Sequence, residues 1–169
     1  MPINLLKEYN NLLELGAFNV RQRTESLKRI FDRDFVDCDP IIFNNKKVTP
    51  TPVNGVITME TLFSHLTTVM EDKKLRNRVF DNHRAVRLHW IKFHLLLKKQ
   101  NNVLTFSVQE PEGVRTYIYD VEEKYVVILE PLRNGIEYYL LTAYKLSGKD
   151  AERNKILSKY NKRRLDQIV

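Results

Sequence analysis

Apolar and polar residues alternate with a period of two between residues 103 and 144, a pattern typical of β-strands. Turn residues interrupt the alternation, and the strongest of these signals is Asn134-Gly135, a dipeptide that favours a tight hairpin. The four strands are expected at residues 103–109, 114–121, 125–130 and 136–144. Because short turns join successive strands, the pattern predicts a four-stranded antiparallel meander.

Before residue 100 the apolar residues recur at helical spacing instead. Helices are expected over residues 2–15, 19–34, 58–72 and most of 73–99, and a closing helix over residues 150–161. In the segment 73–99, the predicted buried stripe consists of Val86, Trp90, Phe93 and Leu97. The element order predicts an α+β fold of N-terminal helices, a four-stranded antiparallel meander and a C-terminal helix, with the helices packed on one face of the sheet.

Residues 39–55 separate the first helices from the rest of the chain. Three prolines and Asn54-Gly55 punctuate this segment, so we expect a loop with at most short extended pieces. We therefore place a helical N-terminal region at residues 1–72 and an α+β domain, which holds the candidate chemistry, at residues 73–169.

Composition indicates an ordinary globular chain. With 169 residues, 43% of them apolar and 29% charged, the chain is long enough for one domain with a buried core. No apolar run approaches the roughly 20 residues of a membrane span, and the N-terminus lacks the pattern of a signal peptide. The single cysteine, Cys38, forms no disulfide within the chain. We expect a cytoplasmic protein with no membrane contact.

Positive charge is concentrated in two parts of the chain. The formal net charge is +7 and the isoelectric point about 9.5, which favours polyanionic partners. Residues 73–99 carry nine Lys and Arg residues, opposed only by Asp81. A second group follows near the C-terminus: Lys155, Lys159, Lys162, Arg163 and Arg164.

Several kinds of site are excluded by missing motifs. The five glycines form neither a dinucleotide-binding loop nor a phosphate-binding loop, and no G-x-S-x-G elbow is present. One cysteine cannot build a cysteine zinc site. His83, His89 and His94 are five or six residues apart, a spacing that does not favour joint ligation from one helix face. We expect no metal and no cofactor.

The remaining cationic and phenolic side chains suit metal-independent cleavage of RNA. In that reaction the 2′-hydroxyl attacks the adjacent phosphorus, so a base, an acid and cations that stabilise the phosphorane are required. His can transfer protons near neutral pH, and Arg presents a planar fork to phosphate oxygens. On a continuous helix, His83, Arg87 and His94 would line one edge of the buried stripe. His65, beside the stripe of the preceding helix, is interpreted as a packed or surface residue.

Three short motifs carry a resemblance to a known family. They are Arg84-Ala85-x-Arg87-Leu88-x-Trp90-Ile91-Lys92, then Tyr125-Val126-Val127-Ile128, then Leu141-Thr142-Ala143-Tyr144. Together they resemble the phage-type branch of the barnase–EndoU–colicin–RelE-like nuclease superfamily, over residues 81–164. The resemblance implies a small α+β ribonuclease that acts without a metal, in phage–bacteria conflict or as a toxin.

The resemblance also implies roles for individual residues. Arg84 and Arg87 would contact phosphate, and Thr142 and Tyr144 would lie at the active-site end of the last strand. Two positions depart from the family's pattern: Phe93-His94 stands where members often have a proline, and Thr116, Tyr117 and Tyr119 stand where members often have a lysine. The general acid and the general base are therefore left open.

The resulting hypothesis assigns eight residues. The catalytic set is His83, His89, Arg87, Thr142 and Tyr144, and the substrate-binding set is Arg84, Lys92 and Tyr119. Structural alternatives remain open: Arg84 and Arg87 could pair with the acidic turn Glu122-Glu123, His89 and His94 could pack beside Trp90, and Tyr139 and Tyr144 could be ordinary sheet residues. Trp90 and Ile91 are interpreted as core.

The sequence thus favours an endoribonuclease that cleaves tRNA or mRNA by 2′-hydroxyl transesterification, as a phage- or toxin-related effector. An acidic antitoxin or immunity protein would be the matching partner. Two alternatives remain open: a non-catalytic RNA- or DNA-binding module, and a protein-interaction adaptor in which the N-terminal helices do the work.

Overall fold

The computed structural model describes residues 3–52, 55, 58–72 and 74–169. The predicted meander is confirmed, with each strand antiparallel to the next. The strands are β5 (Val103–Glu110), β6 (Gly113–Asp120), β7 (Tyr125–Pro131) and β8 (Glu137–Lys145). A register shift against β7 leaves Leu141 as a bulge, so Leu140 and Ala143 both face the same core while Tyr144 packs on the opposite side.

Two short strands from the N-terminal region enlarge the meander into a six-stranded mixed sheet. β1 (Ile42–Phe43) and β2 (Lys46–Pro50) are the short extended pieces expected within residues 39–55. The residues between them, Asn44 and Asn45, both have positive φ, as a tight hairpin turn requires. Residues 53, 54, 56 and 57 of the predicted loop lie outside the described residues.

β2 runs parallel to β8, and this pairing was not predicted. It extends from Lys47 opposite Glu137 to Pro50 opposite Leu140, and the sheet order is β1-β2-β8-β7-β6-β5. Among the described residues, no strand pairs with residues 142–145 on that side of β8. The C-terminal half of β8 is therefore an open edge.

The N-terminal segment is less helical than the apolar spacing predicts. A 3₁₀ helix, η1 (Ile3–Leu6), replaces the helix expected over residues 2–15. The expectation is wrong because Asn10 adopts a left-handed conformation with φ of 72°, which Asn tolerates and a helix does not. The helix expected over residues 19–34 is confirmed as α1 (Val20–Phe31), followed by a short π-helix, η2 (Asp32–Val36).

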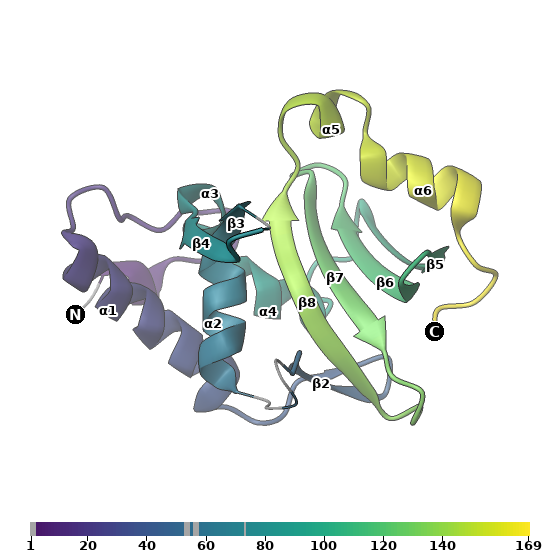
Figure 1. Ribbon diagram of the computed structural model, residues 1–169, viewed down its shortest axis with the longest axis horizontal. Coiled ribbons are helices and arrows are strands. Elements are labelled where there is room, and N and C mark those ends of the chain that lie inside the picture. The colour runs from purple at the N-terminus through teal and green to yellow at the C-terminus, as the bar shows by residue number, and fades with distance from the viewer. Residues whose placement is uncertain (1–2, 53–54, 56–57, 73) are drawn as a thin grey trace.

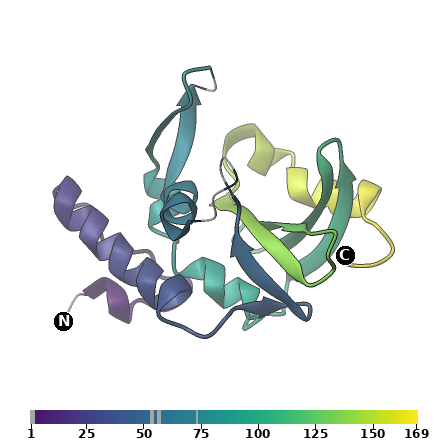
Figure 2. The ribbon, with the colours of Figure 1, turned by 60° about the horizontal axis from the view of Figure 1, so that its bottom comes forward.

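A β-hairpin stands where helix was expected at residues 68–80. α2 (Met59–Thr67) ends early, and β3 (Thr68–Asp72) pairs with β4 (Asn77–Phe80). The β-branched run Thr67-Thr68-Val69 favours extended backbone. At the turn, the Asp72 carboxylate accepts hydrogen bonds from two backbone N–H groups and Arg76 has φ of 52°. Figure 2 shows this hairpin projecting away from the sheet.

The segment after the hairpin contains two short helices instead of one long one. They are α3 (Asn82–Ala85), capped by the Asp81 side chain, and α4 (Trp90–Leu95). Tight turns with i to i+3 hydrogen bonds join them. Of the predicted stripe, Val86 and Trp90 are buried, whereas Leu97 is exposed with φ of 53°.

Helices cover both faces of the sheet (Figure 1). The closing helix is split by Asn154, whose φ is 49°, into α5 (Gly148–Glu152) and α6 (Lys155–Arg163). Ile156 of α6 packs on Phe106 and Tyr117, whereas α1, α2 and α4 contribute to a separate core on the other face. The α+β class is therefore confirmed, and the expectation of helices on one face alone is wrong.

The larger core crosses the predicted boundary at residue 72. Leu27, Phe31 and Leu66 share it with Trp90 and Leu140, and all five are nearly inaccessible to solvent. Trp90 and Ile91 are core residues, as expected. In the described part of the chain, no helix has both the length and the apolar character needed to cross a membrane.

Candidate nucleic-acid site

A cavity of about 480 Å³ lies where α3, the start of β3 and the end of β8 meet. We name it the α3–β8 pocket. Its position follows from the open edge of β8. β2 leaves the C-terminal part of that strand unpaired, and α3 packs against it there. Four of the eight predicted site residues line the pocket: His83, Arg84, Arg87 and Tyr144.

Arg84 connects α3 to β8. Its Nη1 atom donates hydrogen bonds to Thr142 Oγ1 at 2.9 Å and to the carbonyl oxygen of His65 at 3.3 Å. The guanidinium carbon lies 5.5 Å from the centre of the Tyr144 ring. Arg84 thus brings Thr142 and Tyr144, two of the predicted hydroxyl residues, to the wall of the pocket. Burial lowers the pKa of Arg84.

Arg87 is almost fully buried yet incompletely bonded. Its side chain is 7% exposed, and Nη1 donates to the carbonyl oxygen of His83 at 2.7 Å. The guanidinium lies 5.3 Å from the Trp90 ring. Its Nε–H is buried and has no hydrogen-bond partner among the described residues. That atom is enclosed by the protein, whereas Arg87 as a residue lines the pocket together with Arg84, and two guanidinium charges suit an anionic acceptor.

The charge around the pocket is mixed but favours anions. Lys145 adds a cation to Arg84 and Arg87, and Asp81 and Asp150 oppose them. Asp81 is partly engaged, because its Oδ1 accepts a hydrogen bond from the backbone N–H of Arg84 as the cap of α3. The alternative pairing of the two arginines with Glu122 and Glu123 is not among the ion pairs of the described residues.

A second, smaller cavity of about 270 Å³ shares the Arg84 wall. It is lined by His65, Arg78 and Thr142 among others, and we name it the His65 pocket. Burial lowers the pKa of His65, and the neighbouring charges of Arg78 and Arg84 lower it further. Arg78 is held by hydrogen bonds from its Nε and Nη2 atoms to Thr68. A neutral imidazole therefore lies on one side of Arg84, and His83 lies on the other.

The surroundings of His65 could not be predicted from the residues next to it in the chain. Its charged neighbours, Arg78 and Arg84, come from β4 and α3. The hairpin that brings Arg78 back toward α2 lies where the apolar spacing predicts a helix. The one available signal was the β-branched run at 67–69, which ends α2 two residues after His65.

Three predicted residues lie outside both pockets. His89 is buried, with Nε2 3.0 Å from the carbonyl oxygen of Glu8. Tyr119 lies beneath the α5–α6 connection, where its hydroxyl donates to Asn154 Oδ1 at 2.9 Å. Lys92 is a half-buried residue of α4 and lines none of the pockets found in the described part of the chain. Their predicted roles have no support from their positions.

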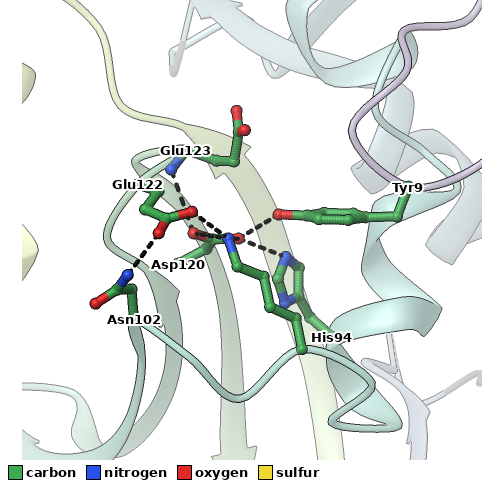
Figure 3. Close-up of polar contacts among 7 residues, drawn as sticks. Tyr9, His94, Asn102, Asp120, Glu122 and Glu123 are labelled. Atoms are coloured by element: carbon green, nitrogen blue, oxygen red, sulfur yellow. Dashed lines mark hydrogen bonds and ion pairs between the residues drawn. The ribbon is translucent and has the colours of Figure 1, made fainter.

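A separate polar group is buried at the end of β6 (Figure 3). Asp120, fully inaccessible, accepts hydrogen bonds from the Tyr9 hydroxyl, from Lys99 Nζ at 3.0 Å to each oxygen, and from the Glu123 backbone N–H at 3.2 Å. His94 Nε2 lies 3.4 Å from Oδ2 of Asp120, and burial lowers the pKa of His94 to about 4. We name Tyr9, His94, Lys99 and Asp120 the Asp120 cluster.

The Asp120 cluster joins three parts of the chain. Tyr9 comes from the N-terminal segment, His94 from α4, and Lys99 from the loop before β5. The ring of Tyr9 also stacks on Phe93 with centroids 4.2 Å apart. Because Asp120 already accepts four hydrogen bonds and is inaccessible, we interpret the cluster as a structural clamp and not as a binding site.

Among the described residues, no three His, Cys, Asp or Glu side chains gather in a group that could hold a metal ion. The candidate site therefore consists of the two pockets that share Arg84. Comparison with known proteins adds no further assignment: no protein-family model, no curated protein and no solved structure matches this chain.

Proposed function

We propose that this protein is an endoribonuclease that cleaves RNA without a metal ion, with the scissile phosphate held by Arg84 and Arg87. The observation that carries the proposal is that Arg84, Arg87 and His83 line one pocket. A phosphate placed there would meet two guanidiniums, an arrangement typical of phosphate recognition.

We assign the two proton transfers to the imidazoles of the two pockets that share Arg84. His65, whose lowered pKa keeps it neutral, takes the proton of the 2′-hydroxyl as that oxygen bonds to phosphorus. The bond from phosphorus to the 5′-oxygen breaks, and His83 donates a proton to that leaving oxygen. The products are a 2′,3′-cyclic phosphate and a 5′-hydroxyl. Arg84 and Arg87 stabilise the charge of the phosphorane.

The motif resemblance supports the same assignment from another direction. Arg84, Arg87, Thr142 and Tyr144 are the residues to which it gives phosphate-contacting and active-site positions, and all four meet at the Arg84 wall. We accordingly propose that residues 81–164 belong to the barnase–EndoU–colicin–RelE-like superfamily. We also propose a toxin-like role on tRNA or mRNA, with an acidic antitoxin or immunity protein as partner.

Incubation of end-labelled total RNA with the protein in EDTA tests this function. We expect fragments with 2′,3′-cyclic phosphate ends, and no fragments from an Arg87→Ala/Tyr144→Ala double variant that keeps its circular dichroism spectrum. Arg29→Gln on α1, outside both pockets, should cleave like the parent protein. RNA that stays intact at a large molar excess of the folded protein would refute the proposal.

A non-catalytic RNA-binding module is the second candidate. It is favoured by the position of His89, which the structure keeps in the interior and which leaves only His83 of the two predicted proton-transfer histidines at the pocket. This function predicts binding that weakens steeply with salt and no product on prolonged incubation.

A further inference from the structure

α6 carries a stripe of cations on the side turned away from its core contacts. Lys155, Lys159, Lys162 and Arg163 follow the spacing i, i+4, i+7, i+8, which places them along one face of the helix. The apolar residues Ile156, Leu157 and Tyr160 lie on the other face and pack against the sheet. The helix is thus oriented by its core contacts. Lys155, Lys162 and Arg163 are exposed, whereas Lys159 is partly buried and bonds Glu110 of β5.

This stripe borders a concave groove of about 420 Å³ between α5 and α6. Arg153, in the turn between the two helices, is its fifth cation, and Asp150 is the only acid in its lining among the described residues. We name it the α5–α6 groove.

Two of the five cations are already engaged. Lys159 bonds the Glu110 carboxylate, and Lys155 lies 3.8 Å from Asp150. Arg153, Lys162 and Arg163 are exposed, and none has an ion pair within the described residues. These three cations give the groove an uncompensated positive charge.

The groove leads away from the α3–β8 pocket. Asp150 lines both cavities, and the chain passes directly from the end of β8 through α5 to α6. In Figure 1, α5 and α6 continue outward from the upper end of β8. A strand with one phosphate at Arg84 and Arg87 would therefore reach the groove with its neighbouring phosphates.

We infer that the α5–α6 groove binds the phosphate backbone of single-stranded RNA next to the scissile phosphodiester, an inference that rests on the proposed function for its substrate. A cationic groove that follows the backbone is the usual way to hold a single strand. A groove of about 420 Å³ is large enough for part of a single strand. We therefore take the substrate to be a single strand longer than a dinucleotide.

The test compares two triple variants that each remove three positive charges. One is Arg153→Gln/Lys162→Gln/Arg163→Gln in the groove; the control is Arg21→Gln/Arg29→Gln/Arg133→Gln, at exposed positions on α1 and in the β7–β8 turn. The probe is a fluorescein-labelled 12-nucleotide 2′-O-methyl RNA, which 2′-hydroxyl chemistry cannot cleave. Binding is measured by fluorescence anisotropy across a salt series.

We expect the groove variant to bind at least about tenfold more weakly, with the slope of log affinity against log salt reduced by about 2, since each lost phosphate contact on a single strand contributes about 0.7. The control variant should change affinity less than about threefold. Equal losses in the two variants, or tighter binding of a 2′-O-methyl duplex than of the single strand, would overturn the inference.

Cleavage assays separate failure of this inference from failure of the proposed function. The groove variant should lose kcat/KM on a 12-nucleotide RNA but keep that of the parent on a dinucleotide, because a dinucleotide does not reach the groove. Equal cleavage of the long strand by parent and variant would refute the role of the groove and leave the proposed nuclease activity intact. Binding that depends on the groove, without any cleavage, would refute the nuclease activity and leave the role of the groove intact.

Discussion

The α3–β8 pocket and the Asp120 cluster are both polar, and they differ in how completely their charges are satisfied. Asp120 is inaccessible and accepts hydrogen bonds from Tyr9, Lys99 and a backbone N–H. Arg84 and Arg87 line a cavity instead, and neither forms an ion pair among the described residues. Removing a buried charge from its partners destabilises a fold, whereas guanidiniums without ion pairs at a cavity wall are a place for an anionic ligand.

This difference predicts that mutations in the two regions affect different quantities. Changes in the Asp120 cluster should lower the free energy of unfolding and leave the chemistry of the folded protein intact. Changes in the pocket should lower RNA binding or cleavage and leave the unfolding free energy near its original value.

The largest effect is expected from Asp120→Ala. It removes the acceptor of the Tyr9 hydroxyl and one of the two carboxylates that Lys99 bonds, the other being that of Glu122. The lost hydrogen bonds to the buried charge are together worth about 3–5 kcal/mol of unfolding free energy. For a chain of this length the melting temperature should fall by roughly 10 °C. Urea unfolding measures the change. Asp150→Ala, at an exposed carboxylate, is the control. Equal unfolding free energies for the two variants would contradict the interpretation of the Asp120 cluster as a structural clamp.

His94 gives the Asp120 cluster a pH dependence of its own. Burial lowers its pKa in the folded protein from 6.5 to about 4, so the unfolded chain binds the proton more tightly between these values. The stability that the neutral ring contributes is complete above pH 6.5 and is lost as the pH falls toward 4. The size of this loss is at most about 3 kcal/mol. Asp120, Lys99, Tyr9 and Tyr125 surround the ring, and the attraction of Asp120 for the protonated form opposes the burial effect.

The measurement is urea unfolding at several pH values in the parent and in His94→Gln. The variant should lose less stability than the parent between pH 6.5 and 4, because its amide does not titrate. His83→Gln, which removes an exposed imidazole, should keep the parent's slope. Parallel curves for the parent and His94→Gln would show that His94 is not the titrating group.

The two histidines that flank Arg84 should affect chemistry and not stability. His65→Ala and His83→Ala should each lower kcat/KM for RNA by about 100-fold, or about 2.7 kcal/mol in the barrier, since each removes one proton transfer. The RNA assay in EDTA measures the rates, and binding of the 2′-O-methyl strand should change far less. A fall in binding equal to the fall in rate would instead indicate that these residues only hold the strand.

The meander was predictable because its signals are local. Alternation over residues 103–144 and the Asn134-Gly135 turn predict both the strands and their order. These local signals are the same whichever face of the sheet the helices cover. The hairpin at 68–80 was not predictable in this way. Apolar spacing around Val69 and Met70 also fits a helix. Whether helix or hairpin forms depends on the turn at Asp72 and Arg76, and hydrophobic periodicity does not detect such a turn.

The site could be predicted only in part for a related reason. Arg84 and Arg87 stand in one motif and Thr142 and Tyr144 in another, so their residue types were visible in the sequence. Their meeting depends on β2, which pairs with β8 only as far as Leu140 and leaves the rest of that edge to α3. The burial of His89 against Glu8 likewise depends on the irregular path of the N-terminal segment, where helix was expected.

The smallest predicted effect, and the most specific to the pocket, is that of Arg87→Lys. Lysine keeps the charge but has one ammonium, which cannot both bond the His83 carbonyl, as Arg87 Nη1 does, and offer a planar fork of donors to a phosphate. We expect about a tenfold loss of affinity for the 2′-O-methyl strand, about 1.4 kcal/mol, with little change in unfolding free energy. Arg29→Lys should change neither quantity. Parent-like binding by Arg87→Lys would mean that charge alone holds the strand, and the planar guanidinium would then have no part in recognition.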